Sequence, residues 1–325
     1  MTTNCINWGI IGAGKIASKF AADLSTVSNS NLYAIASRNL EKANLFGKKF
    51  NANIAYGSYN DLVLDTHIDA IYIATPHSFH KAHTILCLNH NKAVLCEKPF
   101  AMNLQEVEDM IQLSKEKNTL LMEALWTLFL PHYQYVLELI KNNHFGAILK
   151  LEADFGFYPT YNETSRVFDK SVGGGSLLDI GIYPVFAALS TLGQPESIEA
   201  KAEFFSSGAD SKCDIKFHYR SAKANLKSTL LAETNTEAIF HCENGIIKIN
   251  GRFHEPSSVT LIDNEGHSEL KTFNNKTIGY SYEIEHFNQL IRDGKTESDL
   301  MTFERSKQLM SNLDTIRALI GLDYS

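Results

Sequence analysis

Hydrophobic and polar positions divide the first part of the chain into strands and helices. Short apolar runs are followed by segments in which apolar residues recur every three or four positions. Strands alternating with helices at this spacing are typical of a parallel, doubly wound α/β sheet. The expected strands are Ile6–Ile11, Leu32–Ala36, Ile68–Ala74, the run from Ala93 to Glu97 and Leu120–Met122, with a turn at Tyr56–Tyr59 and helices after the first strand, at Leu40–Phe50, up to Asn89 and at Leu104–Lys117.

A different pattern begins after Glu196, where strands follow one another with only short polar turns between them. Such a run predicts an antiparallel sheet, with one face for the flanking helices and one face left over. An apolar leftover face would indicate a protein partner, so a homodimer is expected. The expected elements are a helix to Asn143, strands at Ile148–Tyr158, Ser197–Ser206, Cys213–Tyr219, Ala224–Leu231, Glu237–His241, Gly245–Asn250, Val259–Ile262 and Ser268–Phe273, and helices at Tyr282–Ile291 and Glu304–Ile320.

The two patterns predict two domains, which a length of 325 residues also favours. The texture of the chain changes at Glu123–Pro131. We therefore expect a nucleotide-binding α/β domain at residues 1–123, and an α+β domain with a large, mostly antiparallel open sheet at residues 124–325.

Composition and charge narrow the possible partners. A net charge of −7 argues against a general nucleic-acid binder, which needs a basic surface to neutralise phosphates. No apolar stretch approaches the roughly 20 residues of a membrane span, and the polar start Met1–Asn4 does not resemble a signal peptide. The scattered cysteines include no C-x-x-C pair, which favours buried reduced thiols and a cytoplasmic protein. They are Cys5, Cys87, Cys96, Cys213 and Cys242.

A glycine motif follows the first expected strand. The segment Gly12-Ala13-Gly14-Lys15-Ile16-Ala17 has the form G-x-G-x-x-A and opens a helical pattern. One glycine permits the tight turn, and the other lets a pyrophosphate approach the backbone at the helix N-terminus. Gly9–Lys15 also fits G-x-x-x-x-G-K, the start of an NTPase phosphate loop, but Ile16 stands where that loop needs Ser or Thr. The motif therefore predicts a dinucleotide site with Gly12, Gly14, Lys15 and Ile16 at the cofactor.

The tip of the second strand predicts which cofactor binds. An acidic residue there would bind the ribose 2′-hydroxyl of NAD, whereas an arginine accommodates the 2′-phosphate of NADP. The chain has Ser37-Arg38-Asn39 and no acid at this point. We therefore expect NADP(H) in preference to NAD(H), bound by Ser37 and Arg38. The alternative is that Arg38 is only a solvated loop cation.

Two further strand ends carry polar residues at the same expected sheet edge. One strand ends in Thr75-Pro76-His77, with His80 three residues later, and the next ends in Glu97-Lys98-Pro99. Ligands of open α/β sheets bind at this edge, so Lys98 becomes the central candidate. His77 and His80, even with His83 and His90, lack cysteines or carboxylates at matching spacing, and no metal site is expected.

The second half contributes one chemically suggestive run, Gly173–Pro184. If this run is helical, Asp179 and Tyr183 share one face. Each also has a structural explanation: Asp179 could stabilise a first turn capped by Ser176, and Tyr183 could be a core aromatic beside Pro184. Before this run, the polar segment 161–168 is better suited to a pocket rim than to a core.

Together, these motifs resemble the glucose-fructose oxidoreductase / inositol dehydrogenase family, Gfo/Idh/MocA. The glycine loop, Glu97-Lys98-Pro99 and Gly173–Pro184 carry the resemblance, which covers essentially the whole chain. Tyr183 and the segment Glu123–Thr127 look most like the branch of dimeric dihydrodiol dehydrogenases and NADP-dependent xylose dehydrogenases. That branch commonly has an arginine where this chain has Leu128, which puts the substrate in doubt.

The resemblance implies a Rossmann domain that binds NADP(H) and an antiparallel second domain that forms dimers, or dimers of dimers, through its open sheet. It implies Lys98, Asp179 and Tyr183 as catalytic residues and a cis peptide before Pro99. Thr75, Pro76, His77, His80, Glu97, Lys98 and Trp126 would join the glycine loop at the cofactor. Candidate substrate-binding residues are Tyr158, Tyr161, Asn162, Arg166 and Phe168.

The expected reaction is reversible hydride transfer between NADP(H) and a carbinol carbon of a sugar, polyol or cyclic vicinal diol. Lys98 near Tyr183 would lower the phenol pKa, ordinarily about 10, so that either residue could carry the proton. Two alternatives stay open at this point. One is glycoside cleavage by transient oxidation, which needs tightly held cofactor, usually NAD. The other is a non-catalytic sugar- or NADP-responsive binding protein.

Overall fold

The computed structural model describes residues 5–162 and 165–324, so Glu163 and Thr164 of the expected pocket rim lie outside the described residues. The chain forms two compact units. Unit 1 comprises Met1–Trp126 and Lys276–Lys307, and unit 2 comprises Thr127–Asn275 and Gln308–Ser325. The expected boundaries grouped residues 276–307 with the second domain, whereas in the structure this segment packs with the first.

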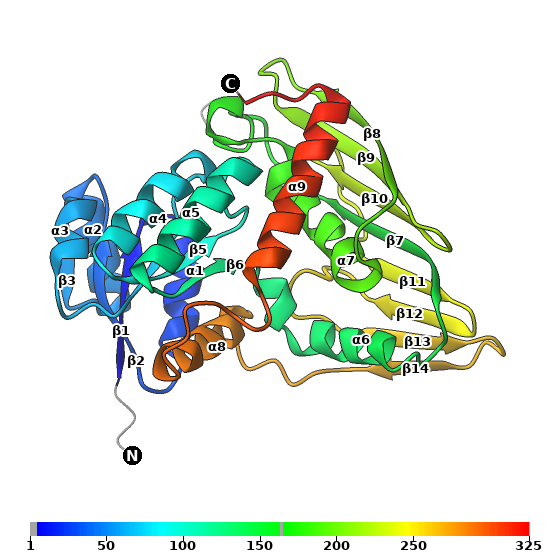
Figure 1. Cartoon of the computed structure of the whole chain (residues 1–325), viewed down its shortest axis with the longest axis horizontal. Coiled ribbons are helices and arrows are strands. Elements are labelled where there is room, and N and C mark those ends of the chain that lie inside the picture. Colours follow the sequence, from blue (N-terminus) through cyan, green and yellow to red (C-terminus); the bar gives the residue numbers. More distant parts are fainter. Residues whose placement is uncertain (1–4, 163–164, 325) are drawn as a thin grey trace. The chain divides into compact units, whose positions relative to one another are not determined.

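Unit 1 is built on a six-stranded parallel sheet in the order β3-β2-β1-β4-β5-β6 (Figure 1). The chain runs outward from β1 in one direction and from β4 in the other, so the two neighbouring strands β1 and β4 flank the topological switch point. The elements are β1 (Ile6–Ile11), α1 (Lys15–Leu24), β2 (Ser30–Ala36), α2 (Leu40–Phe50), β3 (Ile54–Tyr56), α3 (Tyr59–Leu64), β4 (Ala70–Ile73), η1 (His77–Phe79), α4 (His80–Asn89), β5 (Ala93–Glu97), α5 (Leu104–Lys117), β6 (Leu121–Ala124), η2 (Trp126–Phe129, continuing into unit 2) and α8 (Tyr280–Arg292).

Local signals explain most of these boundaries. The Asn39 side chain accepts a hydrogen bond from Lys42 N at the start of α2, and Asn51 ends that helix in the left-handed conformation. Asn103 and Asn118 do the same for α5. The expected turn at 56–59 contains the bend at Gly57, which together with Ser58 joins the end of β3 to the start of α3. Those two elements are too short for a clear periodic pattern and were not predicted.

Helix α8 joins unit 1 through the aromatic core. Trp8 of β1 is fully buried, and its indole N–H donates to Asn288 Oδ1 of α8 at 3.1 Å. Its ring also meets Phe287 at 5.2 Å and Phe20 of α1 at 5.4 Å. A buried indole needs such a hydrogen-bond partner. This arrangement explains why a segment so late in the chain completes the first unit.

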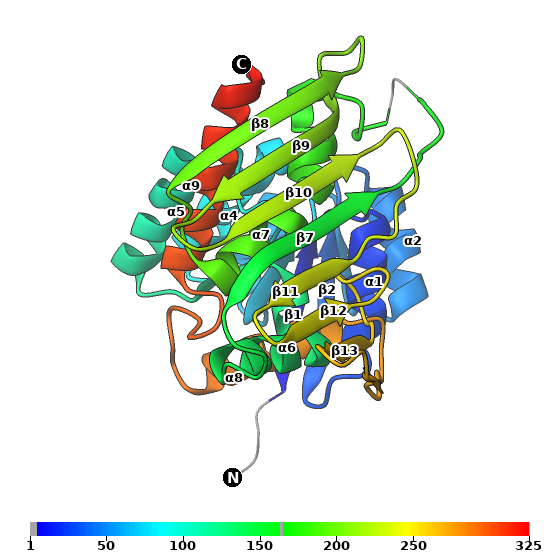
Figure 2. The same cartoon turned by 90° about the vertical axis from the view of Figure 1, so that its right-hand side faces the viewer.

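Unit 2 is built on an eight-stranded sheet in the order β14-β13-β12-β11-β7-β10-β9-β8. All neighbours are antiparallel except β7 and β10, which are parallel, so the expectation of a mostly antiparallel sheet is confirmed. Figures 1 and 2 show α6 and α7 on one face of the sheet. The elements are α6 (Pro131–Lys141), β7 (Ile148–Gly156), η3 (Lys170–Val172), the π-turn η4 (Leu177–Gly181), α7 (Ile182–Leu192), β8 (Ser197–Phe204), β9 (Asp210–His218), β10 (Lys223–Thr229), β11 (Ala238–Cys242), β12 (Gly245–Ile249), β13 (Val259–Asp263), β14 (Ser268–Lys271) and α9 (Phe303–Ile320, which begins in unit 1).

The second face of this sheet carries no helix in the part of the chain that the structure describes (Figure 2). An apolar leftover face was the reason to expect a protein partner, but over β8, β9 and β10 this face is charged. In β9 the buried Cys213, Ile215 and Phe217 alternate with Asp214 and Lys216, because successive side chains of a strand point to opposite faces. The outward residues pair across strands: Lys212 lies 3.0 Å from both Glu203 and Asp214. This half of the open face is therefore a ladder of mixed charges.

Toward β11, β12 and β13 the same face is more apolar. Ile239, Ile246 and Ile262 are half-buried and alternate with fully buried neighbours. Ile246 and Ile262 lie opposite each other in the β12–β13 pair, and Lys248 nearby forms an ion pair with Glu237 at 2.7 Å. The open face thus combines a charged half with a smaller apolar half.

The core of unit 2 corrects one further expectation. Lys170–Leu192 is long and apolar enough to span a membrane, and 89% of its most apolar window is buried inside the protein. Within this segment, η3, η4 and α7 are separate elements, and α7 packs against β7 and β10. We therefore interpret the segment as the core helix of unit 2.

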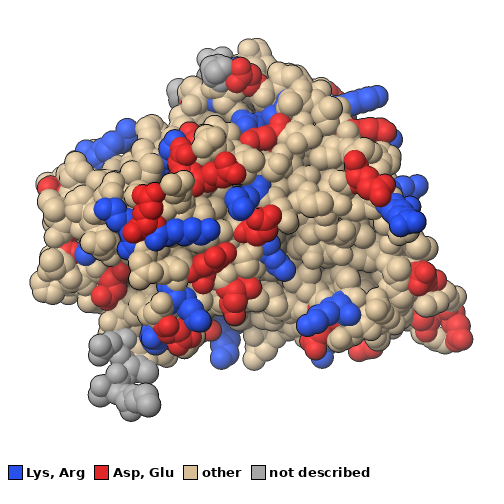
Figure 3. Space-filling view, viewed as in Figure 1, with Lys and Arg blue, Asp and Glu red and all other residues tan. Residues whose placement is uncertain are grey.

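On the face drawn in Figure 3, basic and acidic side chains are interspersed.

All five cysteines are free thiols. Cys87, Cys96 and Cys213 are buried, as expected, and burial raises their pKa values. Cys5 is exposed and Cys242 is only half-buried, so the expectation of burial does not hold for these two.

Candidate active site

The glycine loop lies at the switch point of unit 1, between β1 and α1. Gly12 has φ +99°, and a Cβ there would stand 2.8 Å from the carbonyl oxygen of Ala74. Its own N–H donates to Ala36 O at 3.0 Å, which fixes the loop against β2. Gly12 is therefore required for the turn itself.

Gly14 has a different role. It is the N-cap residue of α1, has an ordinary extended backbone, and would have no heavy atom within 4 Å of an added Cβ. No side chain caps this helix, and its first turn contains no acidic residue. The N–H groups of the first turn and the positive end of the helix dipole are therefore open to an anion, which fits a pyrophosphate.

Arg38 follows β2 at the same edge. Its guanidinium carbon lies 5.8 Å from the centre of the Phe79 ring, while Ser37 is buried and its hydroxyl accepts from Asn39 N at 3.3 Å. The positive charge of Arg38 also affects the pKa of a neighbouring histidine. Burial, followed by the Arg38 charge, lowers the pKa of His83 to about 4, so His83 is a neutral ring here. The surroundings of Arg38 thus combine a cation with neutral aromatic rings.

Sequence reasoning did not place His83 or Tyr59 near Arg38. The two rings lie 4.8 Å apart, edge to face, and His83 also stacks on Phe79 at 5.8 Å. Tyr59 begins α3, a helix that the hydrophobic pattern did not reveal. These stacked aromatic groups and Arg38 form a surface suited to an adenine ring and a phosphate.

The segment after β4 brings Thr75 and both predicted histidines to this edge. His77 is 3% exposed and His80 is fully buried. The two rings lie 5.7 Å apart, edge to face. The His80 ring nitrogens lie 2.8 Å from the carbonyl oxygen of Pro99 and 2.9 Å from that of Thr75. The histidines therefore contribute to the architecture of the two strand ends.

Lys98 stands immediately after β5, half-buried, and the Lys98–Pro99 peptide bond is cis, as the family resemblance implied. Carboxyl groups hold the backbone around it. Lys98 N donates to Glu97 Oε2 at 3.2 Å, and Phe100 N donates to Glu123 Oε1 at 3.0 Å. The Tyr72 hydroxyl donates to the other oxygen of Glu97. The lysine thus sits on a turn fixed by buried side chains from three neighbouring strands.

Burial dominates the electrostatics beneath this turn. It raises the pKa of Glu123 to about 7, although hydrogen bonds from Ser306 and Phe100 N favour the charged form. It also raises the pKa of Glu283 on α8 well above its ordinary value, with the charges of Glu97 and Asp23 adding to the shift. Neither Glu283 oxygen has a hydrogen-bond partner among the described residues. The acids beneath Lys98 are therefore disposed to hold protons near neutral pH.

Trp126, the last residue of the first segment of unit 1, packs against α8. Its ring stacks on Tyr280 of α8, with ring centres 4.5 Å apart and planes inclined at 24°. Tyr280 was not among the predicted site residues, because no local sequence pattern indicates that residues 276–307 pack with unit 1. The stack gives unit 1 an aromatic wall at the position where the resemblance placed Trp126 near the cofactor.

In unit 2, Asp179 lies on the π-turn η4 and Tyr183 on α7, so the expected continuous α-helix is replaced by a π-turn followed by an α-helix. Arg166 comes to Asp179, with Nη2 3.0 Å from Oδ1, and Asp179 is only 7% exposed. Asp179 lies in the first turn of η4, as its structural explanation expected, but the Ser176 side chain does not cap that turn. The Ser176 hydroxyl donates instead to Asp210 Oδ2 at 2.7 Å.

Asp210, on β9, organises the start of this turn. Its Oδ2 also accepts from Leu177 N at 2.7 Å, and a Cβ on Gly175, at φ +122°, would lie 2.0 Å from its Oδ1. Sequence reasoning missed Asp210, because its partners lie more than 30 residues away in the chain. It explains why glycine precedes the turn that presents Asp179.

Tyr183 is 6% exposed and packs in an aromatic group. Its ring centre lies 4.9 Å from that of His254 and 5.8 Å from that of Phe155. His254 is the second residue that sequence reasoning missed. It lies between β12 and β13, and its carbonyl accepts from the Thr127 hydroxyl at 2.7 Å. A titratable ring therefore accompanies the predicted catalytic phenol within unit 2.

The predicted substrate-binding residues are placed differently from one another. Arg166 contacts Asp179, and Tyr158 is 67% exposed just after β7. Tyr161 is exposed, whereas Phe168 is 2% exposed and packs against Tyr161 and Phe205 at ring distances of 4.8 and 5.0 Å. Phe168 thus anchors the segment that carries Arg166. Asn162 ends the first described range, and its carbonyl oxygen accepts from Ser165 N at 2.9 Å.

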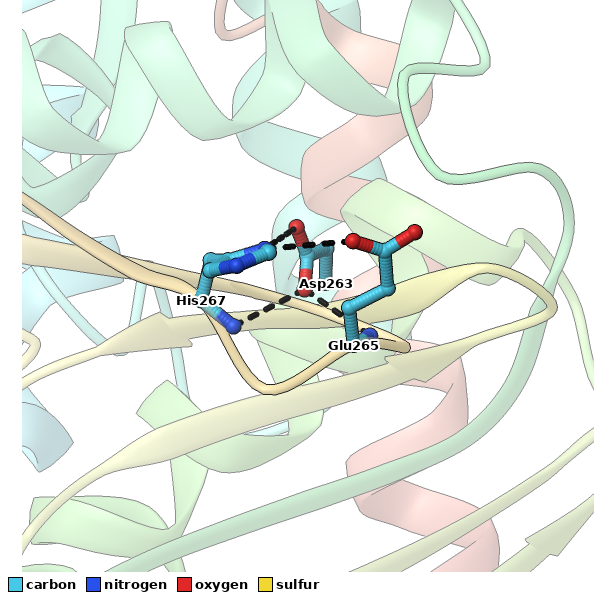
Figure 4. Close-up of side chains that lie close together, drawn as sticks. All are labelled: Asp263, Glu265 and His267. Atoms are coloured by element: carbon cyan, nitrogen blue, oxygen red, sulfur yellow. Dashed lines mark hydrogen bonds and ion pairs between the residues drawn. The ribbon is translucent and has the colours of Figure 1, made fainter.

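Among the described residues, one group has metal-ligand geometry: Asp263, Glu265 and His267 in the turn between β13 and β14 (Figure 4). Asp263 Oδ1 accepts from the backbone N–H of Glu265 and His267, each at 2.9 Å, and Oδ2 lies 3.0 Å from His267 Nδ1. These bonds are those of a surface turn, and none of the three residues belongs to the predicted site.

The sheet order, the glycine loop at its switch point and the Lys98 turn define unit 1 as a dinucleotide-binding Rossmann unit of the kind found in oxidoreductases. Comparison with known families agrees. Residues 6–125 match the oxidoreductase family with an NAD-binding Rossmann fold, GFO/IDH/MocA, and residues 133–248 match the GFO/IDH/MocA C-terminal domain. The chain belongs to the GFO/IDH/MocA family of oxidoreductases, so the resemblance inferred from its motifs is confirmed.

Individual relatives fall within the expected branch. The chain is 35% identical to trans-1,2-dihydrobenzene-1,2-diol dehydrogenase of Xenopus tropicalis and 32% identical to scyllo-inositol 2-dehydrogenase (NADP(+)) IolU of Bacillus subtilis. Each match covers 98% of both chains. Among solved structures, the 3-ketoreductase KijD10 of Actinomadura kijaniata, in complex with NADP and TDP-benzene, matches with a TM-score of 0.88 and 25% identity over 98% of both chains.

Proposed function

We propose that this protein transfers a hydride reversibly between NADP(H) and a carbinol carbon of a sugar, polyol or cyclic vicinal diol. The observation that carries the proposal is the Lys98 turn of a Rossmann unit whose glycine loop leaves a helix N-terminus open to a pyrophosphate. The bound nicotinamide would supply or accept the hydride. The chain's own groups would bind both reactants and move the hydroxyl proton.

NADP(H) is favoured over NAD(H) by the groups around Arg38. The guanidinium stands beside aromatic rings at the end of β2, where an NAD site would have an acid for the ribose hydroxyls. A guanidinium binds a phosphate through paired hydrogen bonds. The relatives support the same choice, since NADP appears in the name of IolU and in the KijD10 complex.

The substrate class is inferred from the relatives and from Leu128. The names of two relatives contain a vicinal diol and an inositol, both of which present neighbouring CH–OH groups. Leu128 replaces the arginine common in the branch and is fully buried in unit 2. A neutral residue at this point favours an uncharged diol or sugar over an anionic substrate.

In this mechanism Lys98 holds the substrate oxygen through its ammonium group, and Tyr183 exchanges the hydroxyl proton. A phenol near an ammonium ion ionises more readily than one in water. Asp179, held by Arg166, accepts a substrate hydroxyl or orients the amine. The Arg166 guanidinium gives this buried carboxylate a charged partner at 3.0 Å.

The test is a panel of aldoses, inositols and vicinal diols, monitored by the absorbance of reduced nicotinamide with NADP and with NAD. Lys98→Met and Tyr183→Phe should lower kcat by about 10²- to 10⁴-fold, the usual contribution of a positioned acid or base. Tyr183→Phe should bind NADPH within about threefold of the parent, because Tyr183 is not among the residues expected at the cofactor. Lys98 is one of those residues, so kcat of Lys98→Met is measured at saturating NADPH. Near-parental turnover in both variants would overturn the mechanism. Binding of sugar and NADPH without turnover of any substrate would instead support a non-catalytic role.

We also propose that the protein is cytoplasmic and forms homodimers, or dimers of dimers, through the open face of unit 2. A face of mixed charges can be complementary to its own copy across a two-fold axis. The strands β7 to β11 line a groove of about 740 Å³ on this sheet, which offers relief for interdigitation. Ultracentrifugation should show a dimer that weakens as salt increases and after Lys216→Glu. A monomer at all protein concentrations and at low salt would contradict this.

A further inference from the structure

His80 combines complete burial with two main-chain acceptors. Its Nδ1 lies 2.8 Å from the carbonyl oxygen of Pro99, and its Nε2 lies 2.9 Å from the carbonyl oxygen of Thr75. Both are ordinary hydrogen-bond distances. A carbonyl oxygen can only accept a hydrogen bond, so each of these contacts requires an N–H on the histidine.

A neutral imidazole carries only one N–H, and its other nitrogen presents a lone pair. In either neutral tautomer, one ring nitrogen would therefore face a carbonyl oxygen at less than 3 Å with no proton between them. That contact would be repulsive, and a buried carbonyl would lose its donor. Only the doubly protonated ring satisfies both acceptors.

We propose that His80 is held as an imidazolium and acts as the positioning residue that ties the end of β4 to the turn of Lys98. Thr75 follows β4 and Pro99 follows Lys98, so the ring bridges the two strand ends on either side of the expected nicotinamide site. The part of this proposal that concerns Lys98 in hydride transfer rests on the proposed function. The protonation of His80 does not.

Burial opposes a charge on His80, and the surrounding groups determine whether it can persist. The His77 ring meets it edge-on at 5.7 Å, which brings a second titratable group beside it. The carboxyl groups of Glu97 and Glu123 stand at the same sheet edge and hold the backbone on both sides of Pro99. The elements packed around α4, and the strand ends beside it, carry further charged and titratable groups. They are Tyr59 and Asp61 on α3, Tyr72 on β4, His77 on η1, Lys81, His83 and Cys87 on α4 itself, Cys96 and Glu97 on β5, Lys98 in the following turn, Glu106, Glu108, Asp109, Lys115, Glu116 and Lys117 on α5, and Glu123 on β6.

The two carbonyl acceptors favour the charged form of the His80 ring, because each accepts an N–H at ordinary hydrogen-bond distance. They are main-chain groups of neighbouring strands, so they cannot turn away when the ring loses a proton. Deprotonation must therefore either leave one contact unsatisfied or move a strand end. The turn that carries Lys98 would then lose its contact with His80 and keep the contacts from Glu97 and Glu123.

The first experiment measures the proton directly on the full-length protein labelled with ¹⁵N-histidine. His80→Gln assigns the resonances. We expect both His80 ring nitrogens to carry protons from pH 6 to at least pH 8, well above the ordinary histidine pKa of about 6.5. A single neutral tautomer at pH 7 would overturn the proposal. This measurement needs no substrate, so it decides the protonation state even if no dehydrogenase activity is found.

The second experiment tests positioning. His80→Phe removes both donors, His80→Gln keeps an amide donor for one carbonyl, and His90→Gln, in the half-exposed residue just after α4, is the matched control. We expect His80→Phe to lower kcat by about tenfold or more, because small displacements of a catalytic group are costly. His80→Gln should recover part of that loss and shift the alkaline limb of the pH profile, while His90→Gln leaves both unchanged. A purely structural role would reduce the yield of folded protein but leave kcat and its pH profile at parental values.

Discussion

Two parts of the same sheet edge in unit 1 are held by different means. The loop after β1 is fixed by backbone conformation, through the positive φ of Gly12 and its hydrogen bond to Ala36. The turn after β5 is fixed by buried titratable side chains, namely Glu97, Glu123 and His80. A backbone-held loop keeps its geometry at any pH. A turn held by titratable groups couples its geometry to protons.

This difference suits the task of each region. A phosphate site needs constant shape and open N–H groups, which glycine and a helix N-terminus supply. A lysine that takes part in proton transfer needs neighbours that adjust its pKa. Buried acids and a buried histidine are neighbours of this kind. Substitutions in either region test this difference, and the largest effect is expected in the glycine loop.

Gly12→Ala should produce the largest effect. The new Cβ would stand 2.8 Å from Ala74 O in a conformation with φ +99°, so we expect a loss of about 4 kcal/mol in the free energy of unfolding, the sum of backbone strain and a clash. NADPH binding should be lost as well. Chemical denaturation and cofactor fluorescence measure the two effects.

Gly14→Ala is the matched control for that change. Its Cβ would meet no atom within 4 Å and its backbone is extended, so unfolding should change by no more than about 0.5 kcal/mol. NADPH affinity should still fall, because the methyl group occupies the approach to the helix N-terminus. Equal destabilisation by the two substitutions would mean that the loop is not held by Gly12.

Glu123→Gln should produce a pH-dependent effect of intermediate size. Burial raises the pKa of Glu123 from its ordinary 4.5 to about 7, so the folded protein binds more protons than the unfolded chain between these values. The contribution of Glu123 to stability is therefore full below about pH 4.5 and is lost as pH rises to about 7, in total about 3 kcal/mol.

The glutamine variant cannot ionise, and its amide oxygen can still accept from Phe100 N. Its stability relative to the parent should therefore rise from pH 4.5 to pH 7 and then stay constant. Thermal or urea unfolding across this range measures the difference, with Glu116→Gln on the exposed face of α5 as control. A constant difference between the two proteins from pH 4.5 to pH 8 would show that Glu123 does not titrate in this window.

Arg38→Ala should produce the smallest effect and should leave folding unchanged, because this side chain is exposed. We expect NADPH affinity to fall by about 30-fold, the loss of a charge-assisted phosphate contact of about 2 kcal/mol, with NADH affinity nearly constant. Isothermal titration with both cofactors measures this ratio. Equal losses for the two cofactors would indicate that Arg38 does not recognise the 2′-phosphate.

Local sequence signals were sufficient for elements whose boundaries depend on neighbouring residues. The bounds of α2 and α5 were predicted as observed, because asparagine caps and left-handed asparagines stop a helix within a few residues. The glycine motif likewise identified the loop at the switch point. Short elements such as β3 and α3 escaped, because three to six residues do not establish a period.

The sequence was sufficient for most strands and helices, the dinucleotide loop, the place of Lys98 after a buried strand, and the family. The surroundings of these residues could be known only from the folded chain. It brought Arg166 to Asp179, Asp210 to Ser176, Tyr280 to Trp126 and His254 to Tyr183, and it packed α8 into unit 1. It also made part of the open face a ladder of charges. The physical reason is that capping and periodicity act over a few residues, whereas burial and hydrogen-bond pairing join residues far apart in the chain.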